Sequence, residues 1–305
     1  MLKPKSRKKK GKNPPPGWLT KLLRGKRKFV AHVRLKGAIG IDRPFSPSLS
    51  MQGVEDALET AFRIPGLSAV AFSINSPGGS PVQSTLIFNR IRQLSEETGV
   101  KVMVFCEDVA ASGGYLLAMA GDEVFADRSS IVGSIGVISA SFGFTGAMKK
   151  VGLERRVYTA GTNKSVLDPF LPEKKEDVAH LKSLQLDVHE AFKDIVRARR
   201  EGKLKADEKE LFSGLFWSGD KALELGLIDG IGGLHSTLRD RFGDDVIIKD
   251  INLAGGFSLR KLLMPGGGAH MQHSLDQAAG SAASAALDQA VTLAEERALW
   301  SRYGL

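Results

Sequence analysis

The residues AVAFSINSPGGSP, at positions 69–81, place an apolar strand directly before the start of a helix. The nearly continuous apolar run 69–74 is typical of a strand that a parallel sheet buries on both faces. Regular structure must stop at Pro77-Gly78-Gly79, and Ser80-Pro81 then provides an N-cap followed by proline at the first helical position. This strand–turn–helix unit predicts an α/β fold.

The same alternation continues on both sides of this unit. Apolar spacing predicts strands at 29–41, 102–105, 122–126, 131–139, 155–158 and 246–248. It predicts helices at 50–63, 81–97, 115–120, 173–201 and 271–300, with two shorter helices within 204–234. Strands and helices in this order indicate a parallel sheet with helical crossovers. We expect a basic arm at 1–28, one catalytic domain at 29–240 and a C-terminal extension at 241–305.

Composition excludes several classes of protein. The 305 residues contain one cysteine, Cys106, so neither an intramolecular disulfide framework nor a cysteine-rich zinc site is possible. The six histidines include no HExxH pair, so the sequence predicts no metal, and it predicts no other cofactor. The apolar and charged fractions, 42% and 25%, are those of a globular protein rather than a disordered one.

The net charge of +9 originates in the N-terminal arm. Residues 1–28 hold twelve of the 43 Lys and Arg and none of the 34 Asp and Glu, which leaves the remainder with a balance of −3. The arm is either a solvated tail or a contact for an anionic membrane, because Trp18, Leu19, Leu22 and Leu23 form an apolar patch among its cations. Nucleic acid is the less favoured partner. With no apolar run of membrane-spanning length and no signal peptide, we expect a cytoplasmic protein that docks peripherally on the inner membrane face.

In an open parallel sheet, ligands and catalytic residues lie at the carboxyl ends of the strands. Two of the predicted strands end in small residues. At the first, Gly78 and Gly79 let a ligand approach backbone N–H groups that can stabilise an oxyanion, although the tripeptide can also be a simple turn. At the second, Ser112 precedes Gly113, at the start of the predicted helix. Ser112 is either an N-cap or a nucleophile with the Gly113 amide beside it.

The base for such a serine is less evident. His180 and His189 fall within the long charged helix, where exposure to solvent is expected, and the absence of a GxSxG elbow disfavours an α/β-hydrolase. Lys164 lies in a loop and is followed by apolar residues. A desolvated lysine can act as a general base, although a surface lysine is the simpler reading of the spacing.

Taken in order, the motifs resemble those of the signal peptide peptidase / protease IV family of bacterial serine proteases over residues 30–240. The matching segments are NSPGGS at 75–80, ASGGY at 111–115, IVGSIGV at 131–137, AG at 160–161 with Lys164, WSG at 217–219 and GLID at 226–229. The resemblance implies a ClpP/crotonase-like fold, a spiral of ββα units. It also implies that Ser112 is the nucleophile and Lys164 the general base. The amides of Gly79 and Gly113 then form the oxyanion hole, Gly78 supports it, and Ser134 hydrogen-bonds the lysine amine.

The function implied is that of a serine endopeptidase that hydrolyses apolar peptides, such as signal-peptide remnants, through an acyl-enzyme. The alternatives are a crotonase-like acyl-CoA enzyme and a non-catalytic, membrane-associated ring scaffold. Family members of this length assemble the dyad across protomers of a homo-oligomeric ring, and the sequence leaves open whether Ser112 and Lys164 pair within one chain. The expected pocket walls are Leu116, Ile135, Val137 and Phe142.

Overall fold

A central sheet carries the described part of the chain, which in this computed structural model comprises residues 27–41, 49–253, 292–294 and 296–305. Its strand order is β6-β5-β3-β2-β1-β8, with β4 beside β3 and β7 beside β4. The strands are β1 (Phe29–Lys36), β2 (Leu67–Ser76), β3 (Val102–Ala111), β4 (Glu123–Ala126), β5 (Ile131–Gly133), β6 (Phe216–Ser218), β7 (Gly230–Ile231) and β8 (Ile247–Ile251). Among the described pairs β5–β6 is antiparallel and the others are parallel.

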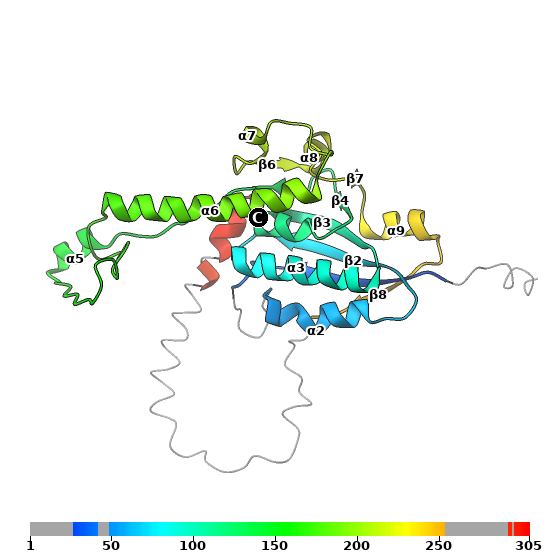
Figure 1. The fold of residues 1–305 in the computed structure, drawn as a ribbon, viewed down its shortest axis with the longest axis horizontal. Helices are drawn as coiled ribbons and strands as arrows, with labels where there is room; N and C mark the ends of the chain where they lie inside the picture. Colours follow the sequence, from blue (N-terminus) through cyan, green and yellow to red (C-terminus); the bar gives the residue numbers. More distant parts are fainter. Residues whose placement is uncertain (1–26, 42–48, 254–291, 295) are drawn as a thin grey trace, which may run out of the picture.

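Helices cover both faces of this sheet (Figure 1). They are α2 (Met51–Phe62), α3 (Pro81–Thr98), α4 (Gly113–Ala118), α5 (Thr145–Val151), α6 (Lys175–Arg199), α7 (Glu208–Leu211), α8 (Gly219–Glu224) and α9 (Leu234–Phe242). The main apolar core packs α2, α3, α4 and the C-terminal end of α6 against one face, and a smaller core packs α9 against the other. The mixed α/β fold predicted from the sequence is therefore confirmed.

The quoted stretch forms the predicted unit. In β2, Val70 and Phe72 face the main core while Ala69 and Ala71 face the α9 side, so the strand is buried on both faces. The side chain of Ser80 accepts a hydrogen bond from the Gln83 N–H at the start of α3. The cap and the buried strand were both predicted, because each depends on neighbours in sequence.

One predicted strand is shorter than expected, and another was wrong. The strand expected at 131–139 ends at Gly133, because Gly133 and Ser134 have φ angles of 109° and 55° and turn the chain out of the sheet. Residues 155–158 form no strand in the described structure, since they are exposed and have no strand alongside to pair with. Residues 29–41 also yield a shorter strand, which ends at Lys36 before Gly37 at φ 117°.

The C-terminal region contributes to the same sheet and core. β8 pairs in parallel with β1, and the chain is helical again at 292–294 and 296–301. The rest of the helix predicted at 271–300, and residues 1–26 of the predicted basic arm, lie outside the described residues. No helix in the described ranges is long and apolar enough to span a membrane.

One part of the chain extends away from the sheet. We call residues 142–184 the projecting arm; it contains α5, the connection to α6 and the first part of α6 (Figure 1). Between Lys175 and Phe192, the first core residue of α6, the helix spans about 25 Å at 1.5 Å per residue. The arm is held together by its own contacts, which include a hydrogen bond from the Phe144 N–H to the Pro169 carbonyl (2.7 Å) and stacked rings of Phe144 and Phe170.

Candidate active site

Ser112 occupies a strained turn between β3 and α4. Its backbone angles are φ 53° and ψ −122°, a region that L-residues rarely adopt and that costs about 1–3 kcal/mol. Its hydroxyl caps none of the described N–H groups of α4, so the N-cap interpretation of this serine is wrong. Its backbone N–H instead donates to the carbonyl of Gly133 (2.8 Å), and the side chain lines a groove. A strand–turn–helix junction of this kind presents a hydroxyl to a ligand.

Gly78 packs directly against this turn. A Cβ atom added to Gly78 would lie 2.8 Å from the Ser112 Cβ and 2.9 Å from the Gly113 nitrogen, so only glycine fits there. The two strand ends are thus side by side, as the sequence predicted, with Ser76 in register with Ala110.

Gly79 completes this side of the site through its contact with Ile39. A Cβ at Gly79 would overlap the Ile39 carbonyl oxygen, and the φ of Gly79 is 145°. The β-bridge between these residues uses the Gly78 carbonyl and the Ser80 N–H, which leaves the Gly79 N–H out of the bridge. The Gly113 N–H stands at the start of α4, ahead of the first bond of that helix, which the Leu116 N–H donates to the Ser112 carbonyl (3.0 Å).

The groove has a volume of about 670 Å³ and its lining is mainly apolar. Its walls include Gly79, Ser112 and Gly113 together with side chains of α3, α6 and the C-terminal segment. Of the four predicted wall residues, Leu116 and Val137 line the groove. Ile135 is fully buried in the core instead, and Phe142 is 80% exposed on the projecting arm.

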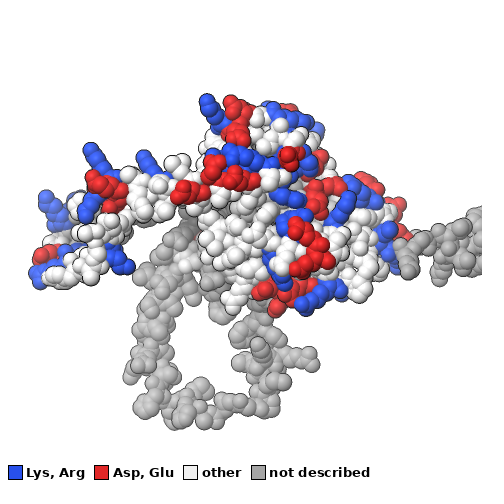
Figure 2. Space-filling model, viewed as in Figure 1, with Lys and Arg blue, Asp and Glu red and all other residues white. Residues whose placement is uncertain are grey.

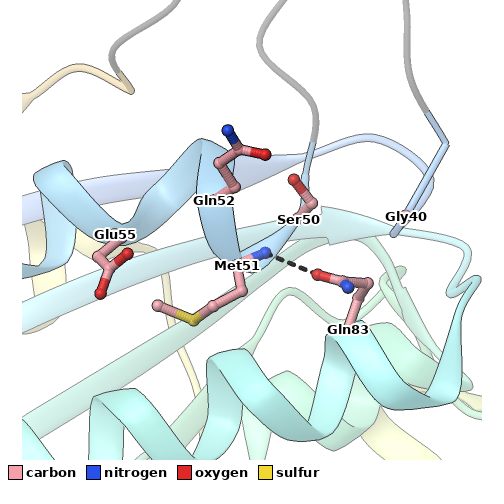
Figure 3. Close-up of a pocket in the computed structure, with 6 residues that line it drawn as sticks. All are labelled: Gly40, Ser50, Met51, Gln52, Glu55 and Gln83. Carbon is pink, nitrogen blue, oxygen red and sulfur yellow. Dashed lines mark hydrogen bonds between the residues drawn. The ribbon is translucent and has the colours of Figure 1, made fainter.

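A second, polar hollow of about 490 Å³ adjoins the groove and shares Gly40 with it (Figure 3). Its lining comes from the start of α2 and from α3, and the Gln83 side chain accepts a hydrogen bond from the Met51 N–H (2.8 Å). This contact fixes the two helix starts relative to each other.

Ser134 lies next to Ser112 at the end of the neighbouring strand. Ala111 and Gly133 are register partners in β3 and β5, and each is followed directly by a serine with positive φ. The Ser134 N–H donates to the Leu215 carbonyl (2.7 Å), and its buried hydroxyl accepts a hydrogen bond from the Tyr303 hydroxyl (3.3 Å). The sequence singled out Ser134 but gave no sign of Tyr303.

Lys164 is placed in a different part of the molecule. It is exposed and lies on the projecting arm, in the connection between α5 and α6 (Figure 1). The described residues that line the groove do not include it. The expected desolvating neighbours Val166 and Leu167 are half-buried beside it on the arm. The single chain therefore brings Ser112, Gly78, Gly79, Gly113 and Ser134 together, and leaves Lys164 apart.

His189 lies within the long helix as predicted, but the expectation that it is exposed to solvent was wrong. Its ring is half-buried, and Nε2 lies 3.1 Å from the carbonyl oxygen of Ile135, the residue after Ser134. The signal was present, because His189 precedes the buried Phe192 and Val196 at helical spacing.

Other titratable groups nearby serve the fold. Burial raises the pKa of the Cys106 thiol to about 12, so this cysteine is not a thiolate nucleophile at neutral pH. Burial alone would raise the pKa of Asp229, but hydrogen bonds from Arg200 and Lys203 have the larger effect. The pKa of Asp229 is therefore held below its usual range. The bond from Arg200 (2.7 Å) ties the end of α6 to the segment after α8. Within the described ranges, no three His, Cys, Asp or Glu side chains form a group that could hold a metal ion.

Comparison with known proteins identifies the family. Residues 95–241 match Peptidase family S49. A protein named as a protease in Synechocystis is 32% identical over 211 residues, which cover 68% of this chain and 70% of that protein. The chain belongs to peptidase family S49. The resemblance to signal peptide peptidases drawn from the motifs is thereby confirmed.

Two further relatives place this S49 chain in context. The chloroplastic serine protease SPPA of Arabidopsis thaliana is 31% identical over 226 residues, which cover 71% of the S49 chain and 32% of that protein. A Brucella abortus protein named Na(+)/H(+) antiporter NhaA is 53% identical over 295 residues, or 95% of the S49 chain and 39% of that protein. The S49 chain thus spans well under half the length of these two relatives.

Proposed function

We propose that the chain is a serine endopeptidase in which Ser112 attacks a peptide carbonyl and forms an acyl-enzyme. The observation that carries this proposal is the strained Ser112 turn, whose hydroxyl is not used as a helix cap and faces an apolar groove. A nucleophile needs such a presentation, because its attack requires an uncrowded approach.

The negative charge that develops on the carbonyl oxygen would be stabilised by the N–H groups of Gly79 and Gly113. Both residues line the groove beside Ser112, and Gly78 is in contact with both Ser112 and Gly113. Two fixed donors of this kind stabilise a tetrahedral oxyanion in the transition state more than the planar substrate.

The general base in this proposal is Lys164 of a neighbouring copy of the chain. Lys164 is exposed and is not among the described residues that line the groove, which favours its supply by a second protomer. The arm also exposes large apolar side chains that a contact with another copy would cover: Phe142, Phe144, Val151, Leu153, Val157, Tyr158, Phe170 and Leu184. We therefore propose a homo-oligomeric ring of ClpP/crotonase-like protomers with composite active sites.

The proposed substrates are extended apolar peptides, including remnants of signal peptides. Apolar side chains such as Leu116, Val137 and Phe192 line the groove and favour apolar residues in the peptide. A crotonase-like acyl-CoA enzyme would have the same oxyanion hole but no need for a strained serine. A ring scaffold without catalysis would need neither the oxyanion hole nor the strained serine.

A fluorophosphonate probe tests the assignment of the nucleophile on the full chain. Labelling of the wild-type protein at Ser112, together with hydrolysis of an apolar peptide, supports the proposal. Ser112→Ala should abolish both, and Ser141→Ala, at an exposed serine outside the groove lining, should leave both intact. Peptide hydrolysis that persists in Ser112→Ala would overturn the assignment.

The basic arm, residues 1–28, suggests where the enzyme meets its substrates. Each Lys or Arg near an anionic leaflet contributes about 1 kcal/mol to the free energy of membrane binding. A ring would present several copies of this basic arm to one membrane surface. In the Brucella relative the matching segment belongs to a longer protein named as an ion antiporter, and ion exchange takes place across a membrane. We propose peripheral binding to anionic membranes. Co-sedimentation with phosphatidylserine vesicles should decrease with salt and be lost without residues 1–28; equal binding by the truncated chain would contradict it.

A further inference from the structure

The last described residues of the chain, 296–305, pack against the two strands that carry Ser112 and Ser134. Tyr303 is 7% exposed and forms a buried cluster with Val109 and Ala111 of β3. Its ring stands edge-on to the ring of Phe216 in β6, with centroids 5.1 Å apart. This segment is therefore anchored directly behind the candidate nucleophile, although it lies almost 200 residues further along the chain.

The same segment also faces the groove. Leu299 and Arg302 belong to the groove lining, together with Ser112 and Gly113. Among the described lining residues Arg302 is the one that carries a formal charge. The segment thus contacts the candidate site in two ways. Leu299 and Arg302 line the groove, and the Tyr303 hydroxyl contacts Ser134.

That hydroxyl reaches one defined atom. The Tyr303 hydroxyl lies 3.3 Å from Ser134 Oγ, and Ser134 is itself 4% exposed. A phenylalanine would fill the same apolar cluster, so the packing of the ring does not require the hydroxyl. A serine hydroxyl has one proton to donate and two lone pairs that accept. When Tyr303 donates to one lone pair, the proton of Ser134 is directed to a different partner.

We propose that Tyr303 is a positioning residue: its hydroxyl donates to one lone pair of Ser134 and fixes that hydroxyl so that its second lone pair accepts an N–H of the general-base amine. This inference rests on the proposed function, in which Lys164 of a neighbouring copy is the general base. An amine held through one of its N–H groups keeps its own lone pair free to accept the proton of Ser112. Without the Tyr303 hydroxyl, Ser134 is free to rotate, and the amine lone pair points toward Ser112 for less of the time.

Other titratable and charged groups on the surrounding elements need to be separated from this effect. They are His189 of α6, which contacts the Ile135 carbonyl, Arg302 of the groove wall, and Glu296, which accepts a hydrogen bond from the Trp300 indole (3.3 Å). None of these groups loses a described contact when only the Tyr303 hydroxyl is removed.

The test is Tyr303→Phe in the full chain, with Ser301→Ala as the matched control. Ser301→Ala also removes one hydroxyl from this segment, but that hydroxyl bonds the Ala298 carbonyl (3.1 Å) and not Ser134. We expect Tyr303→Phe to lower kcat about tenfold, the size of one lost hydrogen bond, with KM nearly unchanged. Ser301→Ala should change neither kcat nor KM.

A double-mutant cycle with Ser134→Ala distinguishes positioning from packing. If Tyr303 acts through Ser134, the double variant should be no slower than Ser134→Ala alone. Should Tyr303→Phe unfold the protein, Ser134→Ala must by itself lower kcat while leaving KM nearly unchanged. Wild-type turnover in Tyr303→Phe, or a further tenfold loss on top of Ser134→Ala, would overturn the inference. A wild-type protein whose Ser112 is not labelled by fluorophosphonate would instead overturn the proposed function.

Discussion

The two predicted catalytic residues, Ser112 and Lys164, stand in opposite physical surroundings. The Ser112 turn adjoins the core: Gly78 packs against it, Gly133 of β5 accepts its N–H, and Tyr303 packs on the preceding Ala111. The Lys164 turn is exposed, and the described contacts around it, such as the ion pair between Arg155 and Asp168 (2.8 Å), lie within the projecting arm. Ser112 is positioned by contacts within its own chain, whereas Lys164 is exposed on the projecting arm.

The surface of the arm supports the same contrast. Tyr158 is 90% exposed, and Figure 2 shows uncharged surface on the arm between charged side chains of both signs. Large apolar patches on a surface often mark interaction sites. The body of the molecule buries its apolar side chains in cores of its own, whereas the projecting arm exposes several large ones.

The largest effect should come from mixing two inactive variants. Ser112→Ala removes the nucleophile, and Lys164→Arg places a guanidinium where a base is needed, one that does not lose its proton. Each alone should lose at least about 10³-fold in turnover. If the groove of one protomer uses the lysine of the next, reassembly of an equal mixture should restore about a quarter of wild-type activity, since heterologous contacts pair at random.

The matched control for this mixture is the double variant, which carries both changes in one chain and should stay inactive with either single variant. A mixture that remains inactive although mixed rings form would place the dyad within one chain. Turnover that survives Lys164→Arg but is lost in His189→Gln would assign the base to His189, whose half-buried ring borders the residue after Ser134.

The next prediction compares two glycines with almost the same backbone. Gly78 has φ 101° and Gly243 has φ 97°, so alanine is strained to a similar extent at both positions. At Gly78 the new Cβ also meets Ser112 Cβ and the Gly113 nitrogen within 3 Å, whereas at Gly243, which does not line the groove, its nearest neighbour is the Asp245 carboxylate at 3.5 Å. Gly78→Ala should therefore lose more than about a hundredfold in peptide turnover, because sub-ångström placement controls the reaction.

Gly243→Ala should keep most of its activity, and both variants should be measured against the same apolar peptide. Equal losses in the two variants would show that backbone strain, and not contact with Ser112, decides the outcome.

A third pair compares two carboxylates whose pKa values are both held low. Asp229 pairs with Arg200, whose side chain is 3% exposed, so Asp229→Asn leaves a buried cation uncompensated and should cost about 3 kcal/mol of unfolding free energy at pH 7. Because the pKa of Asp229 is lowered on folding, its contribution is complete above about pH 4 and is lost as the pH falls below that value. The variant should therefore lose less stability between pH 5 and pH 2 than the wild type does.

Asp168 is the control on the arm. The Phe170 N–H and Arg155 lower its pKa as well, but its contacts stay within the arm, so Asp168→Asn should leave unfolding of the body unchanged. Urea titrations at the two pH values measure both variants. A similar loss of stability in both would mean that arm and body unfold as one unit.

The body could be predicted from the sequence to a much greater extent than the arm. The β2–α3 unit, the Ser80 cap and the turn at Ser112 follow from neighbouring residues, and the structure has them as expected. Residues 155–158 have the composition of a strand, but a strand also needs a pairing partner, which local composition does not provide.

Contacts between distant segments are a further limit. Tyr303 reaches Ser134 across 169 residues, and no local pattern marks either residue as a partner of the other. The local sequence offered Lys164 only as one of two readings, and the resemblance selected it, because no local pattern relates a loop lysine to Ser112.

The smallest effect is expected where the arm meets a second copy. Tyr158→Ser removes an aromatic ring that contributes little to the isolated chain, so the thermal midpoint of the body should stay within about 2 °C of the wild type. In the proposed assembly, the Tyr158 side chain would nevertheless bury apolar surface between protomers. A buried aromatic side chain often contributes about 2 kcal/mol to the free energy of binding at an interface. Light scattering over a dilution series should therefore show dissociation at roughly ten- to thirtyfold higher protein concentration than for the wild type. Ile231→Ser, at an exposed apolar side chain of β7 and not on the arm, should leave assembly unchanged. If both variants assemble like the wild type, Tyr158 is not part of the contact, and if both dissociate equally, the arm is not the specific interface.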